Sequence, residues 1–151
     1  MTDEHTDEPA PRHTVPAGVD EATVTAVGRL TEALETAERA RGHLYSWHQL
    51  TGSADLALGE AVEMLREAGH RDLADRIDHD LVGRNVVQGR WTFQVVEEYD
   101  DDYWSMFRAF EREARDALTE GRRHLHEAAM KEDRRTHGAP GHEARPRPDI
   151  G

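Results

Sequence analysis

Three polar residues with heptad spacing are the strongest candidates for a functional site. Arg41, His48 and Asp55 recur every seven residues. On a helix they share the face that otherwise carries leucine and valine. Polar groups on a buried face need partners. Two interpretations follow: the three residues line a ligand pocket inside a helical bundle, or they form a hydrogen-bond network that only stabilises the fold.

A second candidate site lies in the segment GRNVVQGRW, residues 83–91. Arg84 and Arg90 can hydrogen-bond an anion through their guanidinium groups, and Trp91 can stack on an aromatic ligand. The same residues also suit plain architecture, because a tryptophan can close the end of a bundle and arginines pair with nearby acids. Ligand binding here is therefore a hypothesis beside a structural alternative.

For a metal ion the candidate ligands are His48, Asp75, His79 and Glu97. Asp75 and His79 are four residues apart, which places them on one face of a helix. A ferritin-type centre needs Glu-x-x-His on two helices, and the chain has this motif once, at 67–70. No His-x-x-x-His pair and no cysteine are present, so the usual zinc motifs are missing. No cofactor is favoured.

Composition and missing motifs narrow the function further. The net charge of −12 repels nucleic acid and anionic lipid. A Gly-x-Ser-x-Gly elbow and a phosphate-binding glycine loop are both absent, so an enzyme is disfavoured. We find neither a signal-peptide core nor an apolar run of the roughly 18 residues that a membrane span needs. These features predict a cytoplasmic protein with no membrane or nucleic-acid partner.

The elements that position these residues belong to one predicted helical domain, residues 20–135. Residues 1–19 and 136–151 are polar and carry most of the prolines, so we expect disordered arms there. In the domain a first helix starts at Asp20, a good N-cap. Either one very long helix continues to Gly69 with a polar middle, or two helices meet at 51–53. We favour the break, because Gly52 costs about 1 kcal/mol inside a helix and Ser53 can cap a new one. Gly69 should end that second helix.

The rest of the domain is predicted to hold a short third helix and a long last one. The third covers 72–84, with its inward face formed by Leu73, Ile77 and Leu81. The segment after Asn85 reads as a short helix or an ordered loop following Gly89. The last helix is expected to start at Asp100–Asp102, whose charges suit a helix N-terminus. Its predicted inward face is Tyr103, Phe107, Phe110, Ala114, Leu118, Leu125 and Ala128.

Together these patterns predict an all-α protein, an antiparallel bundle of two long and about two short helices. Long amphipathic helices in a small chain favour association with a protein partner or with a second copy. We therefore expect a non-catalytic protein that acts through protein–protein or self-association, with a homodimer as one form. The alternative is a bundle that binds a small molecule or metal ion at the polar site in its core.

Overall fold

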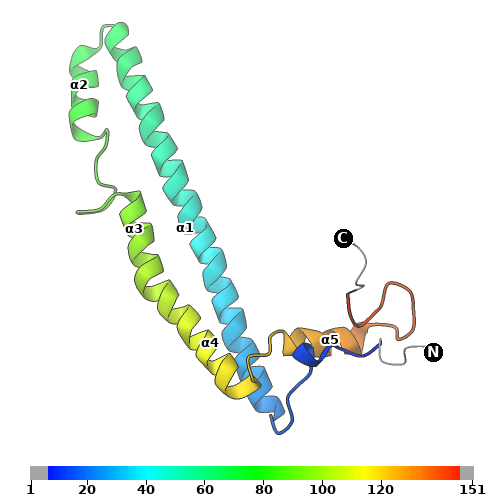
Figure 1. The fold of residues 1–151 in the computed structure, drawn as a ribbon. Helices are drawn as coiled ribbons and strands as arrows, with labels where there is room; N and C mark the ends of the chain where they lie inside the picture. Colours follow the sequence, from blue (N-terminus) through cyan, green and yellow to red (C-terminus); the bar gives the residue numbers. More distant parts are fainter. Residues whose placement is uncertain (1–6, 147–151) are drawn as a thin grey trace. The chain divides into compact units, whose positions relative to one another are not determined.

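The computed structural model describes residues 7–146, and over this range the protein is all-α, as predicted (Figure 1). Its helices are α1 (Glu21–Glu67), α2 (Arg71–Asp80), α3 (Thr92–Tyr99), α4 (Ser105–Thr119) and α5 (Leu125–Arg134). A 3-10 turn, η1 (Pro11–His13), precedes α1, and a π-helical turn, η2 (Asp100–Trp104), joins α3 to α4. Within residues 7–146 no helix is both long and apolar enough to cross a bilayer.

The first helix, α1, is continuous over 47 residues, so the predicted break at 51–53 is wrong. Its start is as predicted: the Thr23 N–H donates to Asp20 Oδ1 at 2.8 Å, and hydrogen bonds from Thr23 lower the pKa of Asp20. Gly52 stays helical because residues on either side of it, His48 and Asp55, are bonded to the returning chain. These tertiary contacts outweigh a propensity cost of about 1 kcal/mol.

Replacing Gly52 by alanine should therefore stabilise the protein by about 0.5–1 kcal/mol. Alanine is the better helix former, and a Cβ atom at this position would meet no atom within 4 Å. Urea denaturation measures the change. Gly69→Ala is the matched control and should destabilise, because Gly69 has a φ of 90°. A destabilised Gly52→Ala variant would mean that residues 51–53 are not helical in solution.

The end of α1 confirms the prediction that Gly69 stops this helix. The Gly69 N–H donates to the Arg66 carbonyl at 3.0 Å, and the His70 N–H donates to the Leu65 carbonyl at 2.8 Å. These two bonds form a Schellman motif, which requires a residue with positive φ after the last helical turn. The chain reverses there and enters α2.

The short helix α2 ends at Asp80, four residues before the predicted end. Gly83 has a φ of 70°, and its N–H donates to the Asp55 carboxylate on α1 at 2.8 Å. This contact draws residues 81–84 out of the helix. The glycine that the sequence analysis placed inside the third helix is thus part of the turn that follows it.

The inward face of α2 also differs from the prediction. Ala74 is fully buried, whereas Leu73 and Leu81 are 43% and 52% exposed; of the predicted inward residues only Ile77 is partly buried. Arg66 on α1 forms ion pairs with both Asp75 and Asp78, so these acids lie on the side of α2 that faces α1. Leu73 and Leu81 point away from that side and stay exposed.

The last helical run begins at Thr92, so the predicted start at Asp100 is wrong. Of the two structures expected after Gly89, a short helix and an ordered loop, the protein has the helix. The N-terminus of α3 is capped by Gln94, whose Oε1 accepts the Trp91 N–H at 2.7 Å. α3, η2 and α4 then follow without interruption. Asp100 lies inside this run. Its negative charge is stabilised by the ion pair with Arg41 and not by a helix N-terminus.

The predicted inward face of α4 is correct only in part: Phe107 and Ala114 are half-buried, but other residues of this face are exposed. Glu111 and Thr119 are 6% and 0% exposed, whereas Phe110 and Leu118 are 59% and 48% exposed. Glu111 is held by polar partners described below, and the extra residue of a π turn changes the phase of the helix that follows it. The hydrogen bonds of Glu111 with Thr31 and Arg115, rather than the apolar pattern, therefore determine which residues of α4 are most buried.

The predicted single helix to residue 135 is divided in two. α4 stops at Thr119, because Glu120 and Gly121 both take positive φ values, 55° and 72°. Thr119 is fully buried, and its hydroxyl donates to the Arg115 carbonyl at 2.9 Å. α5 starts after His124, which also has a positive φ, 58°.

The chain divides into two compact units: unit 1 comprises Met1–Glu35 with Phe107–Gly151, and unit 2 comprises Thr36–Met106. In unit 1 the buried centre includes a charged pair. Glu111 accepts bonds from Arg115 at 3.2 Å and from the Thr31 hydroxyl on α1 at 3.1 Å. The apolar residues beside it, Val27 and Leu125, are 7% exposed each.

The segments on either side of the predicted domain have defined contacts in unit 1. The Arg135 side chain is 3% exposed, and its guanidinium donates to the Asp7 carboxylate at 2.7 Å and to the His142 carbonyl at 3.2 Å. Residues 7–19 and 136–146 thus make contacts with the helical part of unit 1, and the expectation of disordered arms stays a prediction. Residues 1–6 and 147–151 of the predicted arms lie outside the described residues.

Candidate functional site

The three heptad-spaced polar residues of α1 all face the returning chain in unit 2. Arg41 contacts Asp100, His48 contacts Thr92, and Asp55 contacts Gly83. The partner numbers fall as the α1 numbers rise, so the returning chain runs antiparallel to α1 (Figure 1). We call these three contacts the polar ladder.

The strongest contact of the polar ladder joins Arg41 to Asp100. Arg41 Nε and Nη2 donate to the two carboxylate oxygens at 2.7 and 3.0 Å. The Tyr45 hydroxyl donates to the same carboxylate at 3.1 Å, and the Arg41 guanidinium lies 3.9 Å from the centre of the Trp104 ring. The hydrogen bonds from Arg41 lower the pKa of Asp100, while burial opposes this.

The indole of Trp104 is held in place from α1 as well. Its Nε1 donates to Glu38 Oε1 at 3.0 Å. Arg41 therefore lies between a carboxylate and an aromatic ring that are both fixed, which is the environment that a guanidinium prefers. Charge, hydrogen bonds and stacking are all satisfied within the protein.

The other two contacts use smaller groups. His48 Nδ1 lies 2.7 Å from the hydroxyl of Thr92, which is 1% exposed. The Asp55 carboxylate accepts the Gly83 N–H at 2.8 Å. The partners of these residues lie eight and nine residues apart on the returning chain, so sliding that chain by one heptad along α1 would separate all three pairs. The polar ladder therefore fixes the register of the helices, and its binding of a ligand stays a prediction.

The residues of the second candidate site are spread over the turn before α3. Arg90 pairs with Glu98 at 2.6 Å, and Arg84 donates to the Asp80 carbonyl at 3.4 Å. Trp91 is half-buried at the N-cap of α3. Both arginines have partners within the protein, as the structural alternative expects. Their contact with an anion stays a prediction.

The four predicted metal ligands do not form a cluster within residues 7–146. Asp75 is paired with Arg66, and His79 Nδ1 lies 2.7 Å from Asp80 Oδ1; that carboxylate raises the pKa of His79. His48 is bonded to Thr92, and Glu97 is exposed. Helical spacing predicted that Asp75 and His79 share one face. In the structure Asp75 pairs with Arg66, and His79 contacts Asp80 instead of Asp75.

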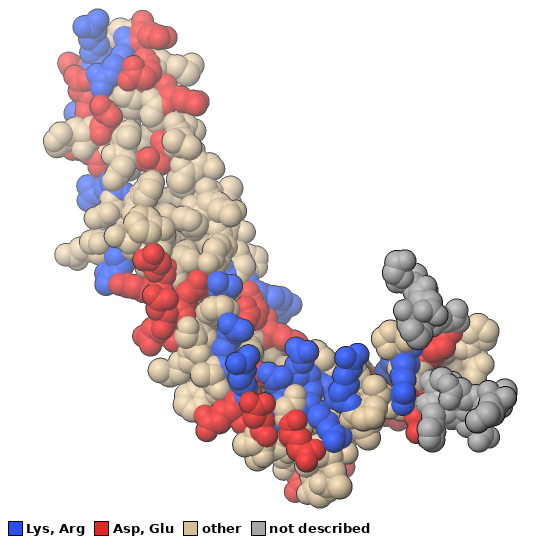
Figure 2. Space-filling model, viewed as in Figure 1, with Lys and Arg blue, Asp and Glu red and all other residues tan. Residues whose placement is uncertain are grey.

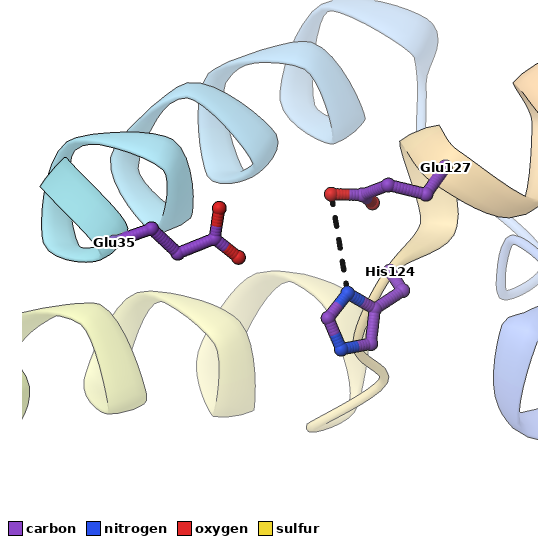
Figure 3. Close-up of side chains that lie close together, drawn as sticks. All are labelled: Glu35, His124 and Glu127. Atoms are coloured by element: carbon purple, nitrogen blue, oxygen red, sulfur yellow. Dashed lines mark ion pairs between the residues drawn. The ribbon is translucent and has the colours of Figure 1, made fainter. Parts of the chain in front are cut away.

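A different trio in unit 1 has the donors and spacing of a cation site. Glu35, His124 and Glu127 each present a ligand atom within 4.8 Å of the others, and all three side chains point toward one another (Figure 3). His124 Nδ1 and Glu127 Oε1 are 3.9 Å apart, too far for a hydrogen bond. One imidazole and two carboxylates suit a divalent first-row metal. Sequence spacing reveals only the His124–Glu127 pair, because Glu35 comes from α1.

The surroundings of this trio weaken it as a metal centre. All three residues are exposed, and His124 also borders a hollow with Arg12, His13 and Arg123. Burial and then these cationic neighbours lower the pKa of His13, which shows that the local field opposes added positive charge. Beside the trio a cavity of about 40 Å³ has room for one or two waters.

A second face of α1 carries a row of exposed apolar residues that the heptad count through Arg41, His48 and Asp55 does not include. Six exposed positions on this face are spaced alternately by three and four residues. We call this set the α1 stripe: Trp47, Leu50, Ala54, Ala57, Ala61 and Met64. A second apolar heptad pattern on the same helix was the available signal.

The α1 stripe lies in the least charged part of the chain. From 42 to 65 the sequence has three acids and no lysine or arginine, in a protein of which 33% is charged. Figure 2 shows a broad uncharged area over the middle of α1, with charged side chains at both ends of it. An exposed apolar area with a charged border is typical of a surface that contacts another protein.

Comparisons with protein-family models, curated proteins and solved structures find no match to this chain.

Proposed function

We propose that this protein acts by self-association, with the α1 stripe as the contact surface. One observation carries the proposal: a helix with an apolar heptad pattern on two faces has a folded partner for only one of them. The first face is covered by the returning chain of unit 2 through the polar ladder. The second presents Trp47, Leu50 and Met64 with exposed fractions of 36%, 69% and 69%.

The two faces are separate surfaces of α1. Successive residues of an α-helix are rotated by about 100°, which places the α1 stripe about 150° around the helix from Arg41, His48 and Asp55. A second helix can therefore pack on the α1 stripe without displacing α3. Its 3–4 spacing is the one that lets a neighbouring helix insert side chains between successive turns.

Unit 2 lacks a core of ordinary size for its length. Only three of its apolar side chains are buried, those of Val62, Ala74 and Val96. Ten large apolar side chains of the same unit are exposed: Trp47, Leu50, Leu56, Met64, Leu73, Leu81, Val87, Phe93, Tyr103 and Met106. A second copy supplies the apolar surface that the unit itself does not bury.

Leu50→Glu tests the proposal, because it places a charge within the contact. We expect the wild-type protein to be a dimer by light scattering and analytical ultracentrifugation. The variant should weaken this dimer about 100-fold. Leu56→Glu is the matched control: Leu56 is also on α1 and 74% exposed, but it lies outside the α1 stripe and its variant should remain a dimer. A monomeric wild type, or equal loss in both variants, would overturn the proposal.

A further inference from the structure

We infer that two copies pair antiparallel along the α1 stripe, with a twofold axis between Ala54 and Ala57. This inference rests on the proposed self-association and adds its geometry. In an antiparallel pair with that axis, facing positions have numbers that add to 111. Trp47 then faces Met64 of the second copy, Leu50 faces Ala61, and Ala54 faces Ala57.

The spacing of the α1 stripe has the symmetry that this arrangement requires. Its intervals are three, four, three, four and three residues, which read the same in both directions. A twofold contact uses one surface patch on both copies, so the patch must be complementary to itself after reversal. The α1 stripe satisfies this condition at all six positions.

The sizes of the side chains select the antiparallel direction over the parallel one. Parallel helices would place Trp47 against Trp47 at one end and Met64 against Met64 at the other, with unequal volumes. The antiparallel pair has one tryptophan and one methionine at each end. Alanines at the centre let the two helices approach closely, and equal volumes at both ends fit helices that diverge evenly from their crossing point.

The polar ladder supports the centre of this contact from the opposite face. Ala54 and Ala57 lie between Gly52 and Gly59, the two residues in this part of α1 with the lowest helix propensity. The contacts of His48 with Thr92 and of Asp55 with Gly83 hold α1 helical on both sides of Gly52. The crossing point therefore lies on a stretch of helix that the rest of unit 2 has already ordered.

Cysteine cross-linking tests the geometry directly, because the chain has no cysteine of its own. Two variants are made, Ala54→Cys and Ala57→Cys, one carrying a tag that changes its mass. Each is oxidised alone and after mixing, and the products are separated without reductant. In the inferred pair residue 54 faces residue 57, whereas two copies of residue 54 are offset by about 4.5 Å along the axis. We expect about tenfold more cross-linked dimer in the mixture than in either variant alone, because disulfides form only at short Cα separations.

Other outcomes separate this inference from the proposed function. Strong cross-linking of Ala54→Cys alone would indicate parallel helices, and a dimer without any 54–57 product would indicate another register or surface. Either result overturns the geometry while self-association stands. A monomer in light scattering overturns both. Leu56→Cys, outside the α1 stripe, is the control and should give no product in any mixture.

Discussion

Arg115→Met should lower the free energy of unfolding by about 3 kcal/mol, the largest effect that the structure predicts for one substitution. The Glu111 side chain beside Arg115 is 8% exposed, and Arg115 is its charged partner among the described contacts. Without the guanidinium, a buried carboxylate keeps only the hydrogen bond from Thr31. Urea denaturation at one fixed protein concentration measures the loss, because association also contributes to stability.

A double variant shows whether the uncompensated charge causes this loss. Glu111→Leu combined with Arg115→Met removes both charges, and we expect it to regain most of the stability. The Thr31 hydroxyl then still donates to the Val27 carbonyl, 3.1 Å away. Arg29→Met is the surface control: the Arg29–Glu32 pair is largely exposed, and its loss should leave the unfolding midpoint unchanged. An Arg115→Met protein as stable as the wild type would show that the pair is fully screened by water.

Asp100→Asn should destabilise the protein by about 2 kcal/mol near neutral pH. The substitution removes the charge that Arg41 and the Tyr45 hydroxyl bind, and leaves the guanidinium with weaker acceptors. Asp101→Asn is the matched control, since Asp101 is the next residue and is exposed. Equal destabilisation by the two variants would contradict a specific role for the Arg41–Asp100 contact.

The same variant should change how stability depends on pH. Asp100 has a pKa below its ordinary value of about 3.9, so its contribution to stability is complete above about pH 5. The contribution is lost as the pH falls through the lower pKa of the folded protein. The difference in stability between wild type and Asp100→Asn should thus be constant from pH 5 to 7 and disappear in stronger acid. Urea midpoints measured across this range check it.

We infer that the two residue patterns on α1, the polar ladder and the α1 stripe, have different roles. The face with the polar ladder fixes how the returning chain aligns, because each of its three contacts needs its own partner. The α1 stripe lacks charge and hydrogen bonds, so it can pack against another helix through shape alone. A helix that is ordered on one face and apolar on another is well suited to self-association.

Local signals in the sequence were reliable where a single residue decides the backbone. Asp20 caps α1 because its carboxylate reaches the Thr23 N–H, and Gly69 ends α1 because it accepts a positive φ. After Gly89 the local pattern left a short helix and an ordered loop both open, and the structure has the helix, α3. In contrast, Gly52 does not break the helix, because its helix-propensity cost is smaller than the stabilisation from the contacts of His48 and Asp55 on either side of it.

The candidate site could be predicted only in part. The heptad count placed Arg41, His48 and Asp55 on one face, but their partners are 28 to 59 residues away in the chain, and no local pattern identifies them. The trio of Glu35, His124 and Glu127 combines α1 with the start of α5, so its third member is invisible to spacing. In α2 and α4, apolar periodicity predicted inward faces that are largely exposed. Asp75 and Asp78 of α2 pair with Arg66, and Glu111 of α4 accepts a hydrogen bond from Thr31.

The sequence alone determined the all-α class, the ends of α1 and the seven-residue spacing of the polar residues, because these depend on local propensity and helical periodicity. Tertiary structure decided the continuity of α1, the buried faces of α2 and α4, and the partner of each polar residue. Those outcomes depend on bonds between distant segments, each worth as much as the local preferences it overrides. The candidate site thus changed from three polar residues that need partners to a polar ladder with known partners, with an unpartnered stripe on another face of the same helix.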